Sequence, residues 1–147
     1  MEIRKIEEKD LLACIKLLKD AYSFPPYNES FKENTAELYI KSKYDVCKEN
    51  SFVFNKEDDV IAFAFISMSC WSDGNQAVLE EIVVAPDYQN QGFGTKLLNF
   101  IDNYLKELNV KSIMIWAKND DRLLKFYKKH NYYLADDFVI MFKNIKK

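Results

Sequence analysis

Residues 83–98 read VVAPDYQNQGFGTKLL, and this stretch predicts a strand, a glycine-containing loop and the start of a helix. The apolar, β-branched run Ile82–Val84 predicts a strand, which must stop at Pro86 because proline has no N–H to donate to a sheet ladder. A polar turn containing Gly92 and Gly94 follows. Apolar residues then recur with the period of a helix, at Leu97, Leu98, Ile101, Leu105 and Leu108. This order directs backbone N–H groups and a helix N-terminus at one place. It therefore predicts an anion site, where the missing Cβ atoms let a phosphate approach.

Two common phosphate-binding motifs do not match this loop. The Walker-A motif ends in Gly-Lys followed by Ser or Thr, whereas here Thr95 precedes Lys96. The dinucleotide-binding fingerprint needs a third glycine after Gly94, and Asn99 and its neighbours supply none. The residues alone leave two interpretations open: an ordinary glycine-containing turn, or a phosphate cradle of another kind.

The segment Gln89–Gly94 resembles the (Arg/Gln)-x-x-Gly-x-(Gly/Ala) signature of the GNAT superfamily of N-acetyltransferases. The preceding Val84-x-Pro86 is also similar to that family. The resemblance implies that backbone groups of Ile82, Val83 and Val84 bind the pantetheine arm of coenzyme A. It also implies that the loop cradles the pyrophosphate, with the candidate residues Gln89, Asn90, Gln91, Gly92, Phe93, Gly94 and Thr95.

Residues 119–132, NDDRLLKFYKKHNY, resemble a second GNAT segment, Asn-x-Arg-Ala-x-x-x-Tyr-Glu-Lys-x-Gly-Phe. The matching positions are Arg122, Tyr127 and the aromatic Tyr132. Three positions depart from the family: Asp120 replaces Asn, Leu123 replaces a small residue, and Asn131 replaces Gly. The last change is mild, because Asn tolerates the left-handed conformation that closes a helix. Asn119 and Tyr127 complete the expected cofactor-binding residues.

Tyr127 is the expected catalytic acid. On helical spacing alone it is a core aromatic with its hydroxyl at the surface. The resemblance favours a further role, since acyl transfer from a thioester to an amine expels a thiolate. A phenol with a pKa of about 10 is well matched to a leaving thiolate with a pKa of roughly 8.5 to 10.

The acceptor amine must also lose a proton. His130, the single histidine, ends a helix, where a surface cation is expected rather than a base. Glu80 and Glu81 lie in the strand before the loop, and adjacent strand residues point to opposite faces. We expect Glu80 to be the catalytic base, because in a regular strand it shares a face with Ile82 and Val84. A bulge would exchange the two carboxylates, and solvent is the remaining alternative.

Length and composition limit the other classes of function. With 147 residues, of which 48% are apolar and 30% charged, the chain is expected to form one domain, residues 1–147, with its own core. A formal net charge of −2 argues against nucleic acid or a membrane as a partner. Cys14, Cys47 and Cys70 are widely spaced and are expected to be buried hydrophobes in a reducing cytosol. No metal site and no secretory signal are expected, and the location is expected to be cytoplasmic.

The segments predict an α/β (α+β) fold similar to that of the GNAT family. A mixed, mostly antiparallel central sheet of about six to seven strands would carry helices on both faces. Helices are expected from Asp10, as N-cap, to Tyr22, from Asn34 or Thr35 to about Val46, from the loop to about Leu108, and over 121–130. Strands are expected at residues 2–6, 51–55, 60–69, 77–84, 112–117, 132–134 and 139–142, those at 60–69 and 112–117 being buried.

The chain is thus identified as a member of the GNAT superfamily that moves acetyl from acetyl-CoA to a primary amine of a small molecule by direct attack in a ternary complex. No cysteine lies in the motifs, which disfavours a covalent acetyl-cysteine. Five aromatics are expected either on the acceptor side of the cleft or simply packing helices: Tyr22, Phe24, Tyr27, Phe31 and Tyr39. Two alternatives stay open, a catalytically silent acyl-CoA-binding module and an enzyme that acts on a protein N-terminus. A homodimer is compatible with the sequence.

Overall fold

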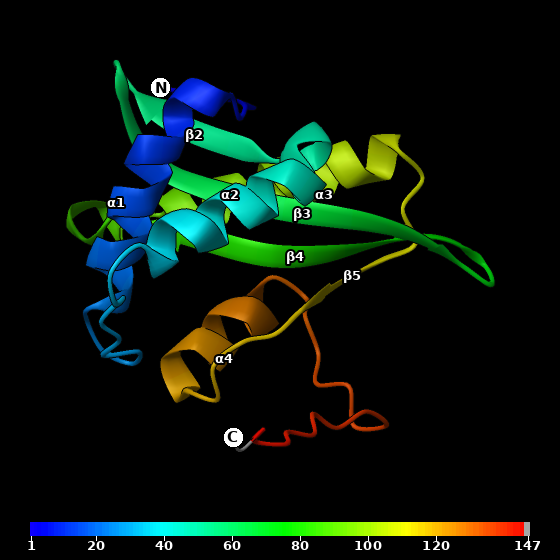
Figure 1. Ribbon diagram of the computed structural model, residues 1–147. Helices are drawn as coiled ribbons and strands as arrows, with labels where there is room; N and C mark the ends of the chain where they lie inside the picture. The colour runs from blue at the N-terminus through cyan, green and yellow to red at the C-terminus, as the bar shows by residue number, and fades with distance from the viewer. Residues whose placement is uncertain (146–147) are drawn as a thin grey trace.

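A five-stranded sheet forms the centre of the computed structural model, which describes residues 1–145 (Figure 1). The strand order is β1-β2-β3-β4-β5; the first three pairs are antiparallel, and β4 and β5 are parallel. In chain order the elements are β1 (Glu2–Lys5), α1 (Leu11–Tyr22), α2 (Thr35–Cys47), β2 (Phe52–Lys56), β3 (Asp59–Trp71), β4 (Gly74–Val84), α3 (Phe93–Glu107), β5 (Ser112–Ile115) and α4 (Asp121–Lys129). Short 3₁₀ turns lie at Glu8–Asp10, Lys48–Asn50 and Pro86–Tyr88.

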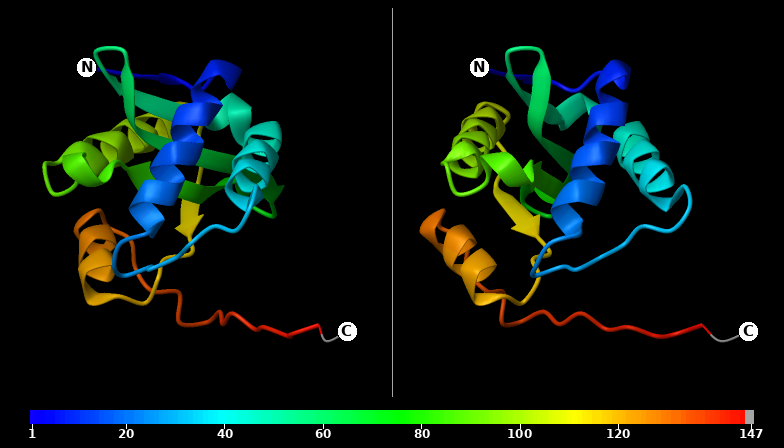
Figure 2. Two further views of the ribbon diagram at one scale, coloured as in Figure 1. Left: turned by 60° about the vertical axis from the view of Figure 1, so that its left-hand side comes forward. Right: turned by 90° about the vertical axis from the view of Figure 1, so that its left-hand side faces the viewer.

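Helices cover the two faces of the sheet unequally. Helices α1 and α2 lie on one face, and α3 lies on the other (Figure 2). The central strand β3 is buried on both faces, as its continuous apolar run predicts. Phe63 and Phe65 pack under α1 and α2, whereas Ala62, Ala64 and Ile66 pack under α3. Two hydrophobic cores therefore flank one sheet.

The prediction of six to seven strands is wrong for the described residues. Residues 132–134 and 139–142 form no strand, and their large apolar side chains beyond Tyr132 are exposed. The expected strand at 112–117 ends at Ile115 and is only partly buried. A continuous apolar run becomes a buried strand only where a neighbouring strand accepts its backbone hydrogen bonds. After α4 the chain runs away from the sheet instead (Figure 1).

Two smaller expectations are also corrected. Asp10 precedes α1, but its side chain makes no cap hydrogen bond to that helix. It accepts hydrogen bonds from Arg4 on both oxygens, each at 2.7 Å, and from the backbone N–H of Glu7, because the 3₁₀ turn brings the carboxylate to the first strand. Cys14 and Cys47 are buried, but Cys70 is exposed near the end of β3. Within residues 1–145, none of the helices combines the length and the apolar character needed to cross a membrane.

Candidate active site

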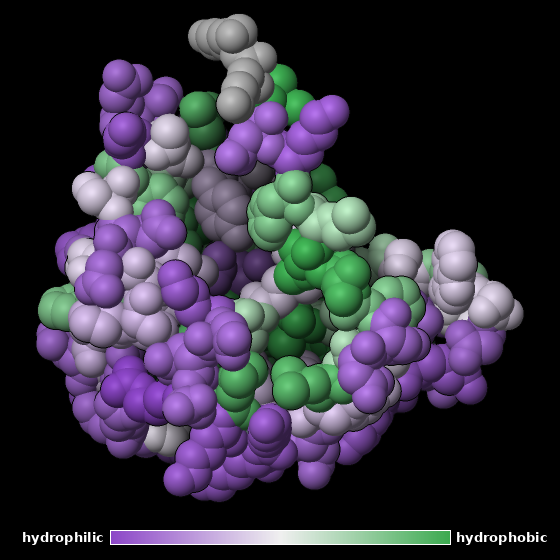
Figure 3. Space-filling model, turned by 90° about the horizontal axis from the view of Figure 1, so that it is seen from below, coloured by the Kyte–Doolittle hydropathy of each residue, from purple (hydrophilic) through white to green (hydrophobic). Residues whose placement is uncertain are grey.

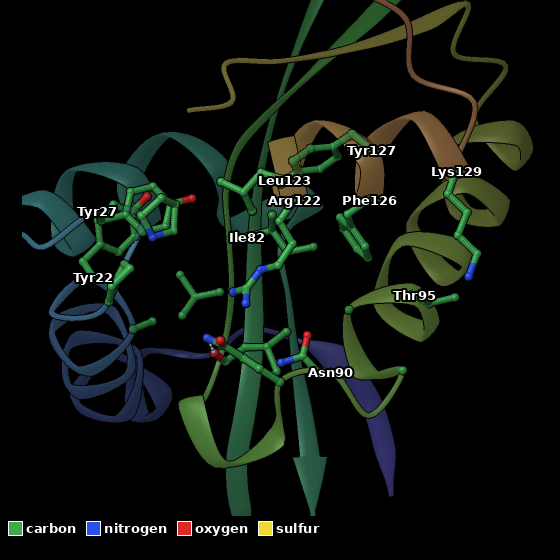
Figure 4. Close-up of a pocket in the computed structure, with 18 residues that line it drawn as sticks. Tyr22, Tyr27, Ile82, Asn90, Thr95, Arg122, Leu123, Phe126, Tyr127 and Lys129 are labelled. Atoms are coloured by element: carbon green, nitrogen blue, oxygen red, sulfur yellow. Dashed lines mark hydrogen bonds between the residues drawn. The ribbon is translucent and has the colours of Figure 1, made fainter. Parts of the chain in front are cut away.

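A cavity of about 380 Å³ opens where β4, the start of α3, the C-terminal end of α1 and α4 converge (Figure 4). Its walls come from segments far apart in the sequence. The end of α1 and the following turn supply Tyr22, Pro25, Pro26 and Tyr27, and β4 supplies Ile82, Val83 and Val84. The opposite wall consists of the loop before α3 and one side of α4.

The N-terminus of α3 faces this cavity without a side-chain cap. Gly92, the residue before the helix, has a φ of +84°, a left-handed conformation that glycine adopts without strain. Gly94 and Thr95 in the first turn line the cavity with it. A Cβ on Gly94 would lie 3.3 Å from Cζ of Phe126, so this glycine also allows α4 to approach α3. The N–H groups of the first turn have no side-chain acceptor, an arrangement that can accommodate an anion.

The loop residues before α3 fall into two groups. Five of the seven predicted residues line the cavity: Gln89, Asn90, Gly92, Gly94 and Thr95. Gln89 donates its side-chain N–H to the carbonyl of Val84 at 3.0 Å, which ties the loop to the end of β4. Gln91 instead donates to the carbonyl of Asp87, and Phe93 is buried in the core beneath α3. Neither Gln91 nor Phe93 is among the lining residues.

The strand β4 offers an open backbone edge to the cavity. Its pairing with β5 covers only Gln76–Leu79. Ile82, Val83 and Val84 lie beyond the paired segment and all line the cavity. An extended ligand with amide groups can therefore lie along this edge in the position of a strand.

Helix α4 supplies the opposite wall and two cations that the prediction did not include. Arg122 and Lys129 line the cavity and are exposed, so they lie at its mouth. Arg122 matched the family segment, but it was not among the predicted site residues because a charged residue on a helix is usually solvated. Nothing in the sequence around Lys129 indicated a binding role. Asn119, predicted to bind the cofactor, is exposed and is not a lining residue.

Tyr127 lines the cavity from the C-terminal half of α4. Its ring contacts those of Phe126 and Tyr132, with centroid distances of 5.2 Å and 5.5 Å. Burial raises the pKa of the Tyr127 hydroxyl above the ordinary value, and nearby Tyr27 and Tyr132 act in the same direction. The phenol therefore keeps its proton at neutral pH.

The two carboxylates of β4 lie on the same side of the sheet because of a β-bulge. Glu81 is opposite Phe65, but Leu79 is opposite Ile66, so Glu80 is the extra residue. The regular strand assumed from the sequence is therefore wrong at this point. Both side chains contact α2, which covers that face.

The surroundings of the two carboxylates differ. Glu80 accepts hydrogen bonds from Lys43 and Ser67, each at 2.7 Å. Although burial acts to raise it, these partners hold the pKa of Glu80 below its usual value. Glu81 accepts hydrogen bonds from the hydroxyls of Tyr22 and Tyr39, each at 2.9 Å. Burial raises the pKa of Glu81 in spite of these hydrogen bonds.

A smaller cavity of about 250 Å³ adjoins the first and contains Glu81. Tyr22 lines both cavities, and its ring stacks on that of Tyr27 at a centroid distance of 4.2 Å. Phe31 and Tyr39 line the smaller cavity, whereas Phe24 is exposed. Four of the five aromatics singled out in the sequence are thus near the site.

His130 lies away from the carboxylates. Its Nε2 is 3.1 Å from the Thr95 hydroxyl, so it links the end of α4 to the start of α3. Among residues 1–145, no cysteine lines the larger cavity.

Comparisons with known proteins agree with this geometry. The model of the acetyltransferase (GNAT) family matches residues 11–132. The [ribosomal protein bS18]-alanine N-acetyltransferase of Escherichia coli K12 is 27% identical over 113 residues, which cover 77% of this chain and 67% of that protein.

Two solved structures share the fold. A protein of Clostridium difficile 630, described as a "possible acetyltransferase", superposes with a TM-score of 0.83 at 20% identity, over 99% of this chain and 98% of that one. AAC(6')-Iy, solved with the bisubstrate analog CoA-S-monomethyl-acetylneamine, has a TM-score of 0.69 at 16% identity, over 99% and 98% of the two chains.

Proposed function

Because the chain belongs to the GNAT family of N-acetyltransferases, which take their acetyl group from acetyl-CoA, we propose that it acetylates a primary amine by direct attack in a ternary complex. One observation carries the proposal. An uncapped helix N-terminus, an open strand edge and the phenol Tyr127 border one cavity.

The residues present fit acetyl-CoA, which would supply the activated thioester. The free N–H groups at Gly94 and Thr95 and the cations Arg122 and Lys129 would hold its phosphates. The backbone of Ile82–Val84 would bind the pantetheine arm, with its amides extending the ladder of β4. Asn119 stays a weaker candidate, because its side chain lies outside the cavity.

Tyr127 would act as the general acid. It lies on the same cavity as the strand edge, and burial keeps its hydroxyl protonated. Transfer of that proton to the leaving thiolate balances the collapse of the tetrahedral intermediate. No covalent enzyme intermediate is required, because the amine attacks the thioester carbon directly.

Glu81 is now the better candidate for the base than Glu80. Glu80 is held by an ion pair with Lys43, which keeps its pKa low and its proton affinity weak. Glu81 has a raised pKa and lies beside Tyr22, which borders both cavities. A proton could pass from the amine to Glu81 through Tyr22 or a water molecule.

The class of amine is a second question. One relative acts on the alanine of a ribosomal protein, and one structural neighbour was solved with an aminoglycoside-type analog. The small cavity beside Glu81 and the stacked tyrosines favour a compact cationic amine over a long peptide. The alternative acceptor is a protein N-terminus, and the alternative class is a silent acyl-CoA-binding module.

One experiment separates these three functions. The protein is mixed with acetyl-CoA and either a panel of small amines and aminoglycosides or peptides with a free N-terminal alanine. Release of free thiol is followed, and acetylated product is identified by mass. Turnover with small amines supports the proposal, and turnover only with peptides supports the N-terminal alternative. Binding of acetyl-CoA without turnover on any acceptor supports the silent module.

A further inference from the structure

The smaller cavity, of about 250 Å³, carries more negative charge than the proposed reaction uses. Glu29 and Glu81 both line it, and within residues 1–145 none of its lining residues is positively charged. Lys43 lies near Glu81, but its Nζ is bound to Glu80 at 2.7 Å. The proposed function engages Glu81 alone, as the base, so the carboxylate of Glu29 has no role in it.

Glu29 is positioned at the mouth of this cavity by the backbone. Its N–H donates to the carbonyl of Tyr22 at 2.7 Å, which closes the turn after α1. The residue is exposed, and it takes part in none of the ion pairs among the described residues. A carboxylate held in this way can pair with a cation that enters the cavity.

Apart from the two carboxylates, the walls of the smaller cavity are aromatic and aliphatic. They consist of Leu18, Tyr22, Phe31 and Tyr39. The hydroxyls of Tyr22 and Tyr39 both donate to Glu81, so what these walls offer a ligand is rings and methyl groups. Such walls suit methylene groups, and ring faces attract cations. Tyr39 already has the Nζ of Lys43 at 5.6 Å from its ring centroid.

We propose that the smaller cavity binds one ammonium group of a short aliphatic diamine, against Glu29, while the other amino group lies beside Tyr22 and is the acetyl acceptor. The inference rests on the proposed function and names the substrate of the same site. Tyr22 lines both cavities, so a ligand beside it reaches both. The smaller cavity has the volume of about eight water molecules of roughly 30 Å³ each, enough for a short methylene chain with an ammonium group. Seen from below, where α4 lies, the molecular surface is hollowed, so the acceptor can enter from this side (Figure 3).

The second ammonium group takes no part in the bonds that form and break. The reactive ammonium gives one proton to Glu81, and the resulting amine attacks the thioester carbon. Tyr127 gives its proton to the leaving thiolate and regains one from the nitrogen as the amide forms. Overall, ammonium and thioester give an amide, a thiol and one proton, which Glu81 releases to water.

Two other small acceptors fit the cavity less well. A monoamine would fill the space beside the acceptor position without pairing with Glu29. An aminoglycoside has many hydroxyl groups, and burying them costs free energy unless they form hydrogen bonds. The tyrosine hydroxyls in these walls already donate to Glu81, so they have no proton left to donate to a sugar.

Steady-state acetylation of diaminopentane and of pentylamine tests the inference, because the two amines differ only in the second amino group. We expect kcat/KM to be roughly tenfold higher for diaminopentane, beyond the statistical advantage of its two equivalent amino groups. This is the effect expected of one ion pair together with one contact between a cation and an aromatic ring.

Variants of Glu29 and Phe31 assign the preference to the smaller cavity. Glu29→Gln should raise KM for diaminopentane roughly three- to fivefold, with kcat and the turnover of pentylamine unchanged, because Glu29 does not touch the reacting atoms. Phe31→Leu keeps an apolar wall without the ring and should also weaken the preference. The matched control is Glu33→Gln, which removes the same charge from an exposed position that lines neither cavity. A preference that survives Glu29→Gln, or that Glu33→Gln weakens equally, overturns the inference.

Calorimetric titration of the same two amines onto protein saturated with coenzyme A separates this inference from the proposed function. Tighter binding of diaminopentane that Glu29→Gln weakens supports the diamine subsite even if no amine is acetylated, and then the proposed function alone fails. Equal binding of the two amines, or binding of neither, overturns the inference. Acetylation of pentylamine would in that case leave the proposed function standing.

Discussion

Two helices begin beside the large cavity, and their N-termini differ. Helix α3 follows Gly92 and has no side-chain cap, so its first N–H groups are free to bind an anion. Helix α4 follows Asp120, whose carboxylate accepts the N–H groups of Arg122 and Leu123, each at 3.1 Å. A carboxylate in that position both occupies the donors and repels a phosphate. Of the two N-termini, that of α3 is therefore the one that fits the proposed pyrophosphate site.

The two helices also differ in burial. Helix α3 is held in the core by five buried residues, Phe93, Leu97, Leu98, Ile101 and Leu105. Helix α4 has no fully buried residue, and its apolar side faces the cavity and the start of α3. A change at the start of α3 should therefore alter ligand binding, whereas changes on α4 away from Arg122 and Lys129 should alter catalysis or local stability.

The largest effect is expected at the N-terminus of α3. Gly94→Asp would place a carboxylate at the expected phosphate position and would also press on Phe126. Gly92→Val would force a β-branched residue into a left-handed conformation. We expect both variants to lose measurable binding of acetyl-CoA in titration calorimetry.

Asn103→Asp is the matched control, because it adds the same charge to an exposed position of α3 outside the cavity. It should bind acetyl-CoA like the unaltered protein. Circular dichroism checks that all three variants are folded. Unchanged affinity in both glycine variants would show that α3 is not the phosphate site and would remove the contrast between the two helices.

The next largest effect is expected on α4. Tyr127→Phe should lower turnover by roughly 10²- to 10⁴-fold, because a general acid is lost. The affinity for acetyl-CoA should stay nearly unchanged, because the hydroxyl acts in the transition state. Tyr132→Phe is the control, since the Tyr132 hydroxyl is buried without a hydrogen-bond partner among the described residues. If Tyr127→Phe turns over within a few-fold of the unaltered protein, Tyr127 is a packing residue only.

A smaller, pH-dependent effect separates the two carboxylates of β4. If Glu81 is the base, turnover should rise with pH through its raised pKa, and Glu81→Gln should lose part of the activity at neutral pH and recover some of it in alkali. Glu80→Gln, which removes the negative charge paired with Lys43, should keep the normal pH–rate profile. The opposite pattern would assign the base to Glu80, and two unchanged profiles would assign it to solvent.

Glu81 should also make the free energy of unfolding depend on pH. Its folded pKa lies above the ordinary 4.5, so the folded state binds the extra proton more tightly than the unfolded state does. The contribution of the Glu81 carboxyl to the free energy of unfolding is complete below pH 4.5 and is lost as the pH rises through the folded pKa. Urea unfolding should therefore show Glu81→Gln gaining stability over the unaltered protein as the pH rises. A gain that does not change with pH would contradict the raised pKa.

Much of the fold follows from the sequence because periodicity reports burial directly. The four main helices and the strands β1 to β4 lie close to their expected positions, and the loop at Gly92 lies between strand and helix as expected. The prediction fails for the C-terminal strands, which do not form in the structure. The apolar pattern at 139–142 identifies a strand-forming segment, but a pattern within one segment does not specify which neighbour it pairs with.

The candidate site was partly predictable for the same reason. Spacing and the family resemblance located Gly92, Gly94 and Tyr127, all of which line the cavity. The sequence analysis named a β-bulge as a possibility, but the sequence alone could not show that it is present, because the bulge depends on how β3 and β4 pair across the sheet. Lys129 was missed because a lysine at the end of a helix is common, and the sequence does not indicate that its side chain lines the cavity.

The smallest effect concerns the cap of α4, and it tests why the two N-termini differ. Asp120→Ala should lower the free energy of unfolding by about 0.5–2 kcal/mol, because two N–H groups lose their acceptor. Asp120→Asn is the matched control, because it keeps a capping oxygen, removes the charge and restores the residue usual in the family segment. Since α4 has no fully buried residue, hydrogen exchange in Asp120→Ala should speed up for α4 amides and stay unchanged for α3. Equal acceleration in both helices would mean that they unfold as one unit. The contrast between a helix held by the core and a helix held by its cap would then be wrong.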